Sequence, residues 1–313
     1  MILEYLLTPK FAVIGAWLSC ALFVHYRGQV RHRFMRQLTD HSTFLAPFNA
    51  LIYLFSKVGR RPFIDTAQFP ELQVFRSNWK VIAAEAQALF DQDEIRASAK
   101  REDIAFNTFF KRGWKRFYFK WYHDVLPSAE ALCPKTTELV RSVPSVHAAM
   151  FTLLPPGGEL GEHHDPFAGS LRYHLGLITP NDDACRIYVD GKMHSWRDGE
   201  HVLFDETYIH SARNDTDQTR IIFFADVARP VHTRAFSALT RFVAKHIACW
   251  TSSRNDDSER LGAVNRLAVF VYASKTFFET LKDFNYRLYY AVKYALALGL
   301  AYWIFVPKEV FAG

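Results

Sequence analysis

A series of short apolar segments between residues 146 and 228 limits the fold more than any other feature of this sequence. The segments are separated by polar or glycine-rich stretches without a helical pattern, and they read AAMFTLL, LRYHLGLI, CRIYV, HVLF and RIIFFADV. Asp190 and Gly191 stand between two alternating runs, which is a signal for a β-hairpin. Short strands that follow one another in this way predict an antiparallel sandwich or jelly roll.

Helical periodicity precedes these strands. Apolar residues recur at three- and four-residue steps from 71 to 90, and residues 128–141 also have a helical pattern. Between them, residues 106–122 (FNTFFKRGWKRFYFKWY) mix aromatic and basic side chains. Such a mixture is typical either of a surface that meets anions or of an ordinary half-buried element. We therefore expect a mainly β core with flanking helices.

Both ends of the chain are hydrophobic. Residues 11–26 read FAVIGAWLSCALFVHY and are followed by several arginines, whereas residues 289–306 read YYAVKYALALGLAYWIFV, interrupted only by Lys293. About 20 apolar residues cross a bilayer, and basic residues after the first segment fit an uncleaved anchor whose following chain is cytoplasmic. A buried core helix is the alternative for each segment, but two of them favour membrane attachment. The second segment would span the bilayer or lie in its interface.

These patterns divide the chain into five expected regions. They are an N-terminal membrane anchor (1–27), a connector (28–70), a domain of helices followed by the β core (71–235), a basic helical region (236–288) and a C-terminal hydrophobic helix (289–306). The net charge of +6 indicates an acidic partner such as nucleic acid, an anionic lipid or a small anion. The four cysteines have no CxxC spacing, so neither a disulfide framework nor a structural zinc site is expected, and a reducing compartment fits.

A polar segment within the β region gathers residues that could bind a metal ion. It reads GEHHDPFAGSLRYHLGL, residues 161–177, and holds His163 and Asp165 in the pattern His-x-Asp. Alternate side chains of an extended segment share one face, and His210, after a later apolar segment, could complete the group. Two histidines and one carboxylate are the ligand set of non-haem Fe(II) oxygenases. The bare pattern is also common by chance in polar loops.

Arg220 strengthens this interpretation. It begins the segment RIIFFADV, and a hairpin from His210 would return the chain alongside, so that the guanidinium could reach the interior that holds the metal. Arginine is the natural bidentate partner of a carboxylate, and an inward arginine among apolar neighbours requires an anionic partner. 2-Oxoglutarate carries a carboxylate at each end and would satisfy this requirement. The alternative is an arginine that ends a surface strand.

Neighbouring polar residues receive less specific predictions. Asp205 and Glu206 could orient His210 through a hydrogen bond, as ligating histidines usually require. His164 points away from His163 in an extended segment, so we expect it at the surface or behind the ligands. The other histidines have no partner at metal-ligand spacing and are interpreted as structural or exposed: His194, His201 and His232.

Residues 140–230 resemble the aspartyl/asparaginyl β-hydroxylase family of Fe(II)- and 2-oxoglutarate-dependent dioxygenases, together with PKT at 134–136. The motifs that carry the resemblance are LLPPG, HHDPFAGSLRYHLGL, WRDGEHVLFDETYIH and RIIFFADVARP. The whole chain, with HYRGQVRHRFMRQLTDHSTFLAPFN and GWKRFYFKWY, is similar to the bacterial lipid A 2-hydroxylases of that family. This resemblance implies a double-stranded β-helix and the use of Fe(II), 2-oxoglutarate and O₂.

The resemblance also implies roles for individual residues. The catalytic iron would be bound by His163, Asp165 and His210. The cosubstrate would be bound at its remote carboxylate by Arg220 with Thr152, and near the metal by Arg172 and His174. Animal peptide hydroxylases of the family have glycine where this chain has Asp165, so the third ligand distinguishes this chain from them.

The function implied by the resemblance is hydroxylation of carbon 2 of an acyl chain of lipid A. The catalytic domain would face the cytoplasm at the bacterial inner membrane, with a membrane lipid and no nucleic acid as its partner, and protein partners stay open. Two enzymatic alternatives are another membrane lipid, such as an aminolipid acyl chain, and Asp or Asn side chains of a protein. The non-enzymatic alternative is a membrane sensor or scaffold that binds iron or 2-oxoglutarate without turnover.

Overall fold

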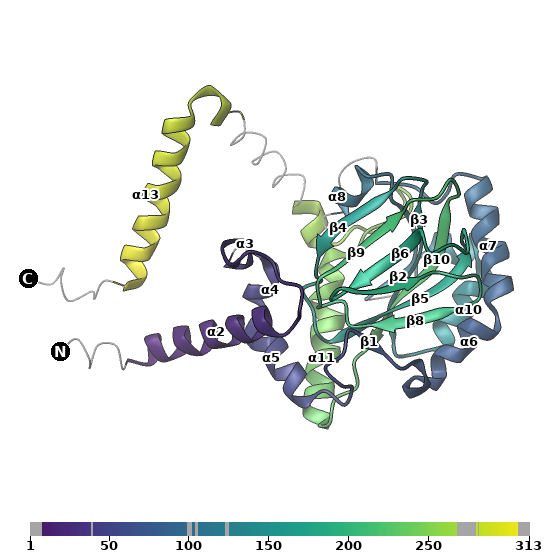
Figure 1. Ribbon diagram of the computed structural model, residues 1–313, viewed down its shortest axis with the longest axis horizontal. Coiled ribbons are helices and arrows are strands. Elements are labelled where there is room, and N and C mark those ends of the chain that lie inside the picture. The colour runs from purple at the N-terminus through teal and green to yellow at the C-terminus, as the bar shows by residue number, and fades with distance from the viewer. Residues whose placement is uncertain are drawn as a thin grey trace, which may run out of the picture.

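The computed structural model describes residues 8–38, 40–98, 102–103, 106–122, 125–267, 280 and 282–305. Two antiparallel sheets face each other (Figure 1). The larger has the strand order β1-β8-β5-β10-β3-β2 and the smaller has the order β4-β9-β6-β7. Their bounds are β1 Phe63–Ile64, β2 Lys115–Trp121, β3 Val146–Leu154, β4 Glu159–His163, β5 Ser170–Ile178, β6 Cys185–Val189, β7 Lys192–Ser195, β8 His201–Phe204, β9 His210–Asn214 and β10 Arg220–Ala228.

The connection pattern of β3 to β10 identifies the fold. Apart from the hairpin between β6 and β7, consecutive strands alternate between the two sheets. This alternation is the jelly roll, or double-stranded β-helix, and it confirms the predicted fold class. The turn between β6 and β7 is formed by Asp190 and Gly191, both with positive φ, as expected of a tight hairpin. The short, largely polar strands β4 and β9 are not among the strands that the apolar pattern predicts.

The helices lie mostly before the jelly roll and after it. Their bounds are α2 Pro9–Tyr26, α3 Phe34–Leu38, α4 His41–Phe44, α5 Ala46–Phe55, η1 Thr66–Gln68, η2 Pro70–Leu72, α6 Gln73–Ser77, α7 Trp79–Asp91, α8 Asn107–Phe110, α9 Pro127–Leu132, α10 Pro134–Ser142, α11 Arg234–His246, η3 Ala248–Thr251 and α13 Tyr286–Phe305. The helix predicted at 71–90 is interrupted at Asn78, whose side chain donates to the Val74 carbonyl. The helix predicted at 128–141 is split before Pro134, which cannot donate to the preceding turn.

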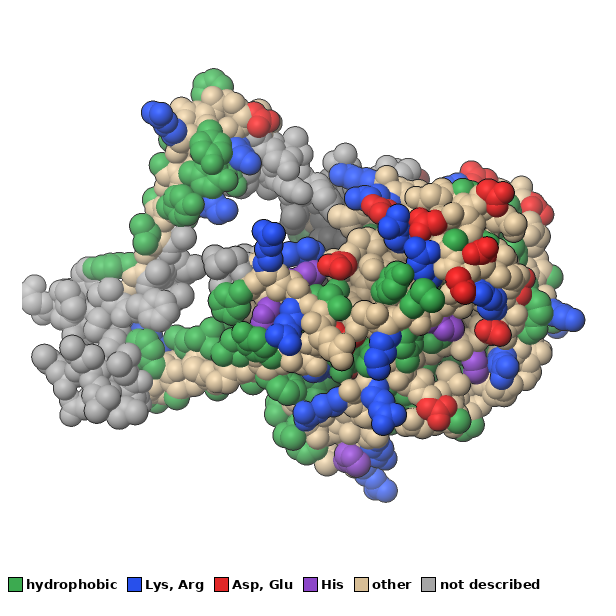
Figure 2. Space-filling model, viewed as in Figure 1, with side chains coloured by type: hydrophobic (Ala, Val, Ile, Leu, Met, Phe, Trp, Pro, Cys, Tyr) green, Lys and Arg blue, Asp and Glu red, His purple; other side chains and the backbone are tan. Residues whose placement is uncertain are grey.

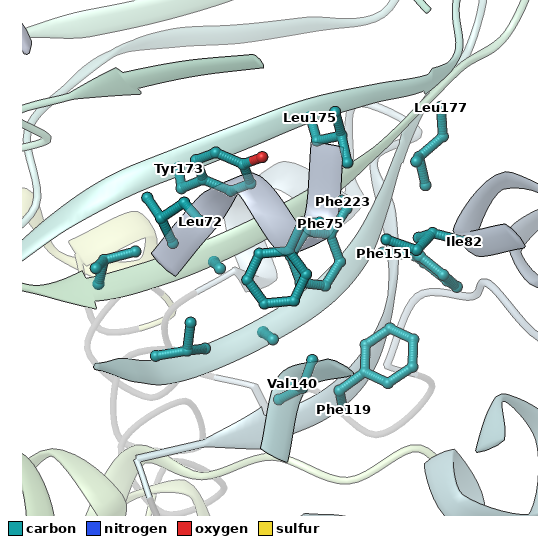
Figure 3. Packing of buried hydrophobic residues seen from close by; sticks show 14 of the residues in the cluster. Leu72, Phe75, Ile82, Phe119, Val140, Phe151, Tyr173, Leu175, Leu177 and Phe223 are labelled. Atoms are coloured by element: carbon teal, nitrogen blue, oxygen red, sulfur yellow. The ribbon is translucent and has the colours of Figure 1, made fainter. Parts of the chain in front are cut away.

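The outer face of the larger sheet carries the main hydrophobic core. Phe75 of α6 packs on Phe223 of β10 with ring centroids 4.9 Å apart, and Phe119 of β2 meets Phe151 of β3 at 4.7 Å (Figure 3). Ile82 of α7 and Val140 of α10 close this layer from the helical side. Strands β3, β5 and β10 of the larger sheet therefore rest on a closely packed helical layer, which holds their register.

The basic and aromatic segment 106–122 is mostly interior, not an anion-binding surface. Its second half forms β2, where Phe117 and Phe119 are fully buried. Arg116 is also buried and pairs with Asp103 at 3.2 Å. This half of the segment is therefore the ordinary buried element of the two alternatives, and the alternative of a surface that meets anions is wrong for Arg116. Its charge is already neutralised inside the domain.

The N-terminal helix α2 leaves the domain as an arm (Figure 1). Among the described residues it is the one helix whose length and composition would allow it to cross a membrane, and little of it is buried. Figure 2 shows hydrophobic side chains along this arm, with Lys and Arg side chains on the adjoining surface of the domain. The C-terminal hydrophobic segment lies in α13, and its last residue, Val306, is outside the described residues.

Candidate metal centre

Three side chains from two strands and a loop form a group that could hold a metal ion. His163 ends β4 and pairs directly with His210 at the start of β9, which brings their ring centroids to 4.2 Å. Asp165 follows β4 by two residues, and its backbone N–H donates to the Glu206 carbonyl at 2.9 Å. One ligand atom from each of the three side chains lies within 4.8 Å of the others. The structure thus brings together the three residues that the sequence predicts as ligands.

Both histidines are oriented by their own backbone. Nδ1 of His163 donates to the Gly161 carbonyl at 2.7 Å, and Nδ1 of His210 donates to the Tyr208 carbonyl at 3.0 Å. With Nδ1 protonated, Nε2 of a neutral ring has a lone pair for a metal. Burial lowers the pKa of both, to about 3 for His210, so both rings are neutral at physiological pH. The backbone therefore performs the orienting role that was predicted for Asp205 and Glu206.

Asp165 belongs to a cluster of three carboxylates around one arginine. The guanidinium of Arg172 contacts Asp165 at 2.7 Å and Asp226 at 2.7 Å, and it also pairs with Glu206. Burial raises the pKa of Asp165, but Arg172 and His210 outweigh it and hold this pKa well below its usual range. Burial raises the pKa of Glu206 and of Asp226. Asp165 is therefore the carboxylate of this cluster that stays ionised beside the two neutral imidazoles, and such a donor set suits a divalent metal ion.

Asp205 and Glu206 have other partners than the one predicted for them. Asp205 is fully enclosed and pairs with Arg27 and Arg229, each at 2.9 Å. Glu206 accepts from Ser170 at 2.6 Å, in addition to its pairing with Arg172. Neither contacts His210 in any hydrogen bond that the structure records, so the prediction that they orient His210 is wrong.

A second, positively charged feature lies on the inner face of the larger sheet. Arg220 is 2% exposed, and its guanidinium carbon is 4.5 Å from the centre of the Trp196 ring. Its Nε and one terminal nitrogen have no hydrogen-bond partner among the described residues. Burial lowers its pKa to about 10, which still leaves it charged at neutral pH. A buried, charged guanidinium with such donors suits an anion, and the binding of one at Arg220 stays a prediction.

Two of the other cosubstrate candidates, Thr152 and His174, share this face with Arg220. Thr152 of β3 pairs with Ile222 of β10, two residues from Arg220, so the side chains of Thr152 and Arg220 point to the same side. His174 of β5 is 6% exposed, and neither of its ring nitrogens has a hydrogen-bond partner among the described residues. Burial, followed by the charges of Arg172 and Arg220, holds the pKa of His174 well below its usual value. An anion with several oxygen atoms could accept hydrogen bonds from both Arg220 and His174.

The segment that follows α2 is fixed beside the metal-binding group. Arg27 is buried between the rings of Tyr53 and Tyr208, 4.1 and 3.8 Å from their centres, where it pairs with Asp205. The backbone N–H groups of residues 29 and 30 both donate to Asp190 at the tip of the β6–β7 hairpin, at 2.6 and 2.9 Å. Because Val189 pairs with His210, this contact is adjacent to the metal ligands. Arg27 is therefore an interior residue, in contrast to its expected place in an exposed basic flank.

Sequence reasoning missed several residues that complete the site. Asp226 could have been found, because an aspartate within the apolar segment RIIFFADV must be paired if it is buried. Trp196, beside Arg220, gives no comparable signal. Arg27 and Asp205 pair across 178 positions in the sequence, and no local pattern connects them.

The comparisons with known proteins agree with this geometry. A family model described as Aspartyl/Asparaginyl beta-hydroxylase matches residues 76–230, which include all three metal-ligand candidates and Arg220. Residues 76–230 therefore match the aspartyl/asparaginyl β-hydroxylase family, as the motifs in this region implied. The matched residues contain the whole jelly roll from β3 to β10.

Individual relatives cover the same region. The chain is 33% identical over 187 residues to the ornithine lipid ester-linked acyl 2-hydroxylase of Rhizobium tropici, covering 58% of this chain and 65% of that protein. It is 27% identical over 177 residues to the human aspartate beta-hydroxylase domain-containing protein 2, covering 54% and 47%. The chain therefore spans less than two thirds of either relative. A Pseudomonas putida prolyl-4-hydroxylase structure matches with 17% identity and a TM-score of 0.35, covering 49% of this chain and 87% of that one.

Proposed function

We propose that this protein is a membrane-attached Fe(II)- and 2-oxoglutarate-dependent dioxygenase that hydroxylates carbon 2 of an acyl chain of a membrane lipid, with lipid A as the leading substrate. The observation that carries the proposal is the pairing of two complementary sites on one jelly roll. A group of two imidazoles and one carboxylate suits a divalent cation, and the buried Arg220, with two nitrogens that have no hydrogen-bond partner in the described part of the chain, suits an anion.

The donor set fits iron and its cosubstrate. His163, Asp165 and His210 would hold Fe(II), leaving coordination positions for other ligands. Arg220, with Thr152, would bind the remote carboxylate of 2-oxoglutarate, and His174 would contact the cosubstrate nearer the metal. When bound, iron with 2-oxoglutarate and O₂ supplies oxidising chemistry that yields succinate, CO₂ and a hydroxylated C–H position. The chain itself orients the ligands, binds the dicarboxylate and encloses the site.

Arg172 has a different place in this proposal from the one implied by sequence alone. Its guanidinium is engaged by three carboxylates, one of which is the proposed iron ligand Asp165. It would therefore orient Asp165 and balance the charge around it. Its direct contact with the cosubstrate, implied by the family resemblance, stays a prediction.

The contacts of the N-terminal segment support a membrane substrate. The ion pair between Arg27 and Asp205 fixes the end of α2 close to the strand that carries His210. If α2 crosses the bilayer, the proposed catalytic site is held near the membrane surface, where an acyl chain could reach it. The arginines that remain exposed after α2, Arg31, Arg33 and Arg36, would keep this side of the membrane cytoplasmic. Iron(II) and 2-oxoglutarate are available in that compartment.

A second surface near α2 has the composition of a membrane interface. On α5, Leu51 and Leu54 are 45% and 65% exposed. Phe55 of α5 stacks on Phe236 of α11 at 4.2 Å, and α11 exposes Phe242 beside basic residues in its last turn. An apolar surface with neighbouring Lys and Arg fits contact with anionic lipid. These helices, with Trp250 of η3, would place the domain against the headgroups.

The identity of the lipid is the finer part of the proposal. Resemblance to the lipid A 2-hydroxylases extends to the segments around α2 and β2, and lipid A is an acidic glycolipid that suits a chain with a net charge of +6. Ornithine lipid is the second candidate, because the Rhizobium tropici relative that is 33% identical is named for its ester-linked acyl chain. Both substrates would place the same carbon, next to an acyl carbonyl, at the metal.

Mass spectrometry of cellular lipids tests the proposal. The intact protein would be expressed in a bacterium that makes both lipids and lacks such an enzyme, beside a strain that carries His210→Ala at equal abundance. We expect one added oxygen atom on lipid A in the first strain, located by fragmentation at carbon 2, and none in the second. If the added oxygen atom is found on ornithine lipid alone, ornithine lipid and not lipid A is the substrate. Unchanged lipids, with purified protein that produces no succinate from 2-oxoglutarate, would contradict the dioxygenase itself.

A further inference from the structure

A second group of potential metal ligands lies behind the first. His164 turns away from His163 and is 5% exposed, so it is interior and not a surface residue. Its Nε2 lies 2.9 Å from Oδ1 of Asp40 and 3.1 Å from Oγ of Ser42. The ring of His32 packs edge-on against the His164 ring, with centroids 5.3 Å apart. One ligand atom from each of His32, Asp40 and His164 lies within 4.8 Å of the others.

His32 gives an independent sign that this group is incomplete. It is 6% exposed, and its Nε2 has no hydrogen-bond partner among the described residues. A buried imidazole nitrogen without a hydrogen-bond partner is unfavourable, and a metal ion would satisfy it.

We propose that His32, Asp40 and His164 form a second, structural site for a divalent transition-metal ion of the zinc class. Two imidazoles and one carboxylate are ligands that Zn²⁺ accepts, and Ser42 or a water molecule could complete a tetrahedron. The cysteine spacing gave no indication of such a site, because its ligands are histidine and aspartate. This proposal does not depend on the hydroxylase function.

The place of these residues in the chain indicates what the ion would do. His32 and Asp40 belong to the segment that follows α2, whereas His164 stands between the two iron-ligand candidates His163 and Asp165. An ion shared among them would attach the segment after α2 to the loop of the first metal centre. It would act together with the Arg27–Asp205 pair, and it would hold His32 and Asp40 against the loop that follows β4.

Metal stoichiometry of the full-length protein in detergent tests the site. Co²⁺ serves as the probe, because its visible absorption reports the coordination geometry. We expect two equivalents bound by the wild-type protein, one by His163→Ala/His210→Ala, and none when Asp40→Asn is added to that double variant. His32→Ala alone should bind one equivalent. His194→Ala, a half-buried histidine outside both groups, is the matched control and should bind two.

The alternative is a hydrogen-bonded cluster without a metal. A double variant with a native circular dichroism spectrum that binds no Co²⁺ would overturn the proposal. If that variant does not fold, single variants still decide: an unchanged stoichiometry in both Asp40→Asn and His32→Ala refutes the site. Trypsin gives a further readout at the exposed Arg33 and Arg36, where cleavage should be faster in Asp40→Asn than in the metal-loaded wild type. Equal cleavage rates would refute the attachment role.

Discussion

Removal of the Arg220 guanidinium is the sharpest test of the proposed cosubstrate site. In Arg220→Ala the remote carboxylate of 2-oxoglutarate would lose its bidentate partner inside a nearly fully buried region. Truncation of one member of such a buried charge pair costs about 2–5 kcal/mol. Each 1.4 kcal/mol is a factor of ten, so the dissociation constant for 2-oxoglutarate should rise by a factor of about 30 to about 4,000.

The assay is anaerobic calorimetric titration of 2-oxoglutarate into protein loaded with Fe(II), so that binding is measured without turnover. Intrinsic tryptophan fluorescence is a second signal, because the guanidinium lies 4.5 Å from the centre of the Trp196 ring. Arg213→Ala is the matched control: Arg213 is exposed on β9 and pairs with Asp215 at 3.2 Å, so its loss should leave binding unchanged. Arg220→Lys should bind more weakly than wild type, since lysine keeps the charge but not the planar fork.

Protein stability separates a binding role from a structural role for Arg220. Without cosubstrate, Arg220 is a buried cation whose Nε and one terminal nitrogen have no hydrogen-bond partner among the described residues. Arg220→Met should therefore leave the unfolding temperature of the cosubstrate-free protein unchanged or raise it. Added 2-oxoglutarate should stabilise the wild type and not the variant. Normal cosubstrate affinity in Arg220→Ala, or a large loss of stability in Arg220→Met, would refute the assignment of Arg220 to the cosubstrate.

Three further predictions concern the metal, the docking of α2 and the topology. His210→Ala should abolish Fe(II) binding and turnover with the fold retained, and Asp165→Gly should reduce turnover strongly, both measured as succinate formation. Burial raises the pKa of Asp205, but Arg229 and Arg27 outweigh it and lower this pKa. The ionised Asp205 should therefore stabilise the protein fully above about pH 4, and this stabilisation should be lost as the pH falls through the folded-state pKa. Acid unfolding curves of Asp205→Asn should show a weaker dependence on pH. A reporter inserted within residues 252–260 should be cytoplasmic, and a periplasmic result would contradict the proposed topology.

Much of the β core could be predicted from the sequence because its strands have a strong local signal. Strands β3, β5 and β10 are buried on both faces, so they appear as nearly continuous apolar runs. β4 and β9 are short and half-exposed, and polar residues at most of their positions hide the alternation. Even so, their pairing is what joins His163 to His210. The sequence shows the three proposed metal ligands as a motif, but it does not reveal the pairing of β4 with β9 that brings them together.

The contacts between buried polar side chains could not be predicted from the sequence for a different reason. Arg27 pairs with Asp205, and His32 and Asp40 meet His164, across more than a hundred positions of sequence. A local pattern carries no information about which distant charge will neutralise a buried one. The arginines after α2 therefore looked alike in the sequence, although one is enclosed in the domain and others are exposed. Only the folded arrangement separates an interior residue from a membrane flank.

The strand β10 shows how one segment supports both stability and the proposed chemistry. Phe223, Ala225 and Val227 face the helical layer and belong to the main core, whereas Arg220 and Asp226 face the smaller sheet. On the inner face, two nitrogens of the buried Arg220 have no hydrogen-bond partner among the residues that the structure describes, and Asp226 shares Arg172 with two other carboxylates. Both arrangements are costly in the absence of ligands. The outer face offsets this cost with close aromatic packing, such as Phe223 against Phe75. Substitutions on the two faces should therefore have different effects. Those at Phe223 should lower the unfolding temperature, whereas those at Arg220 should mainly change the affinity for the ligand.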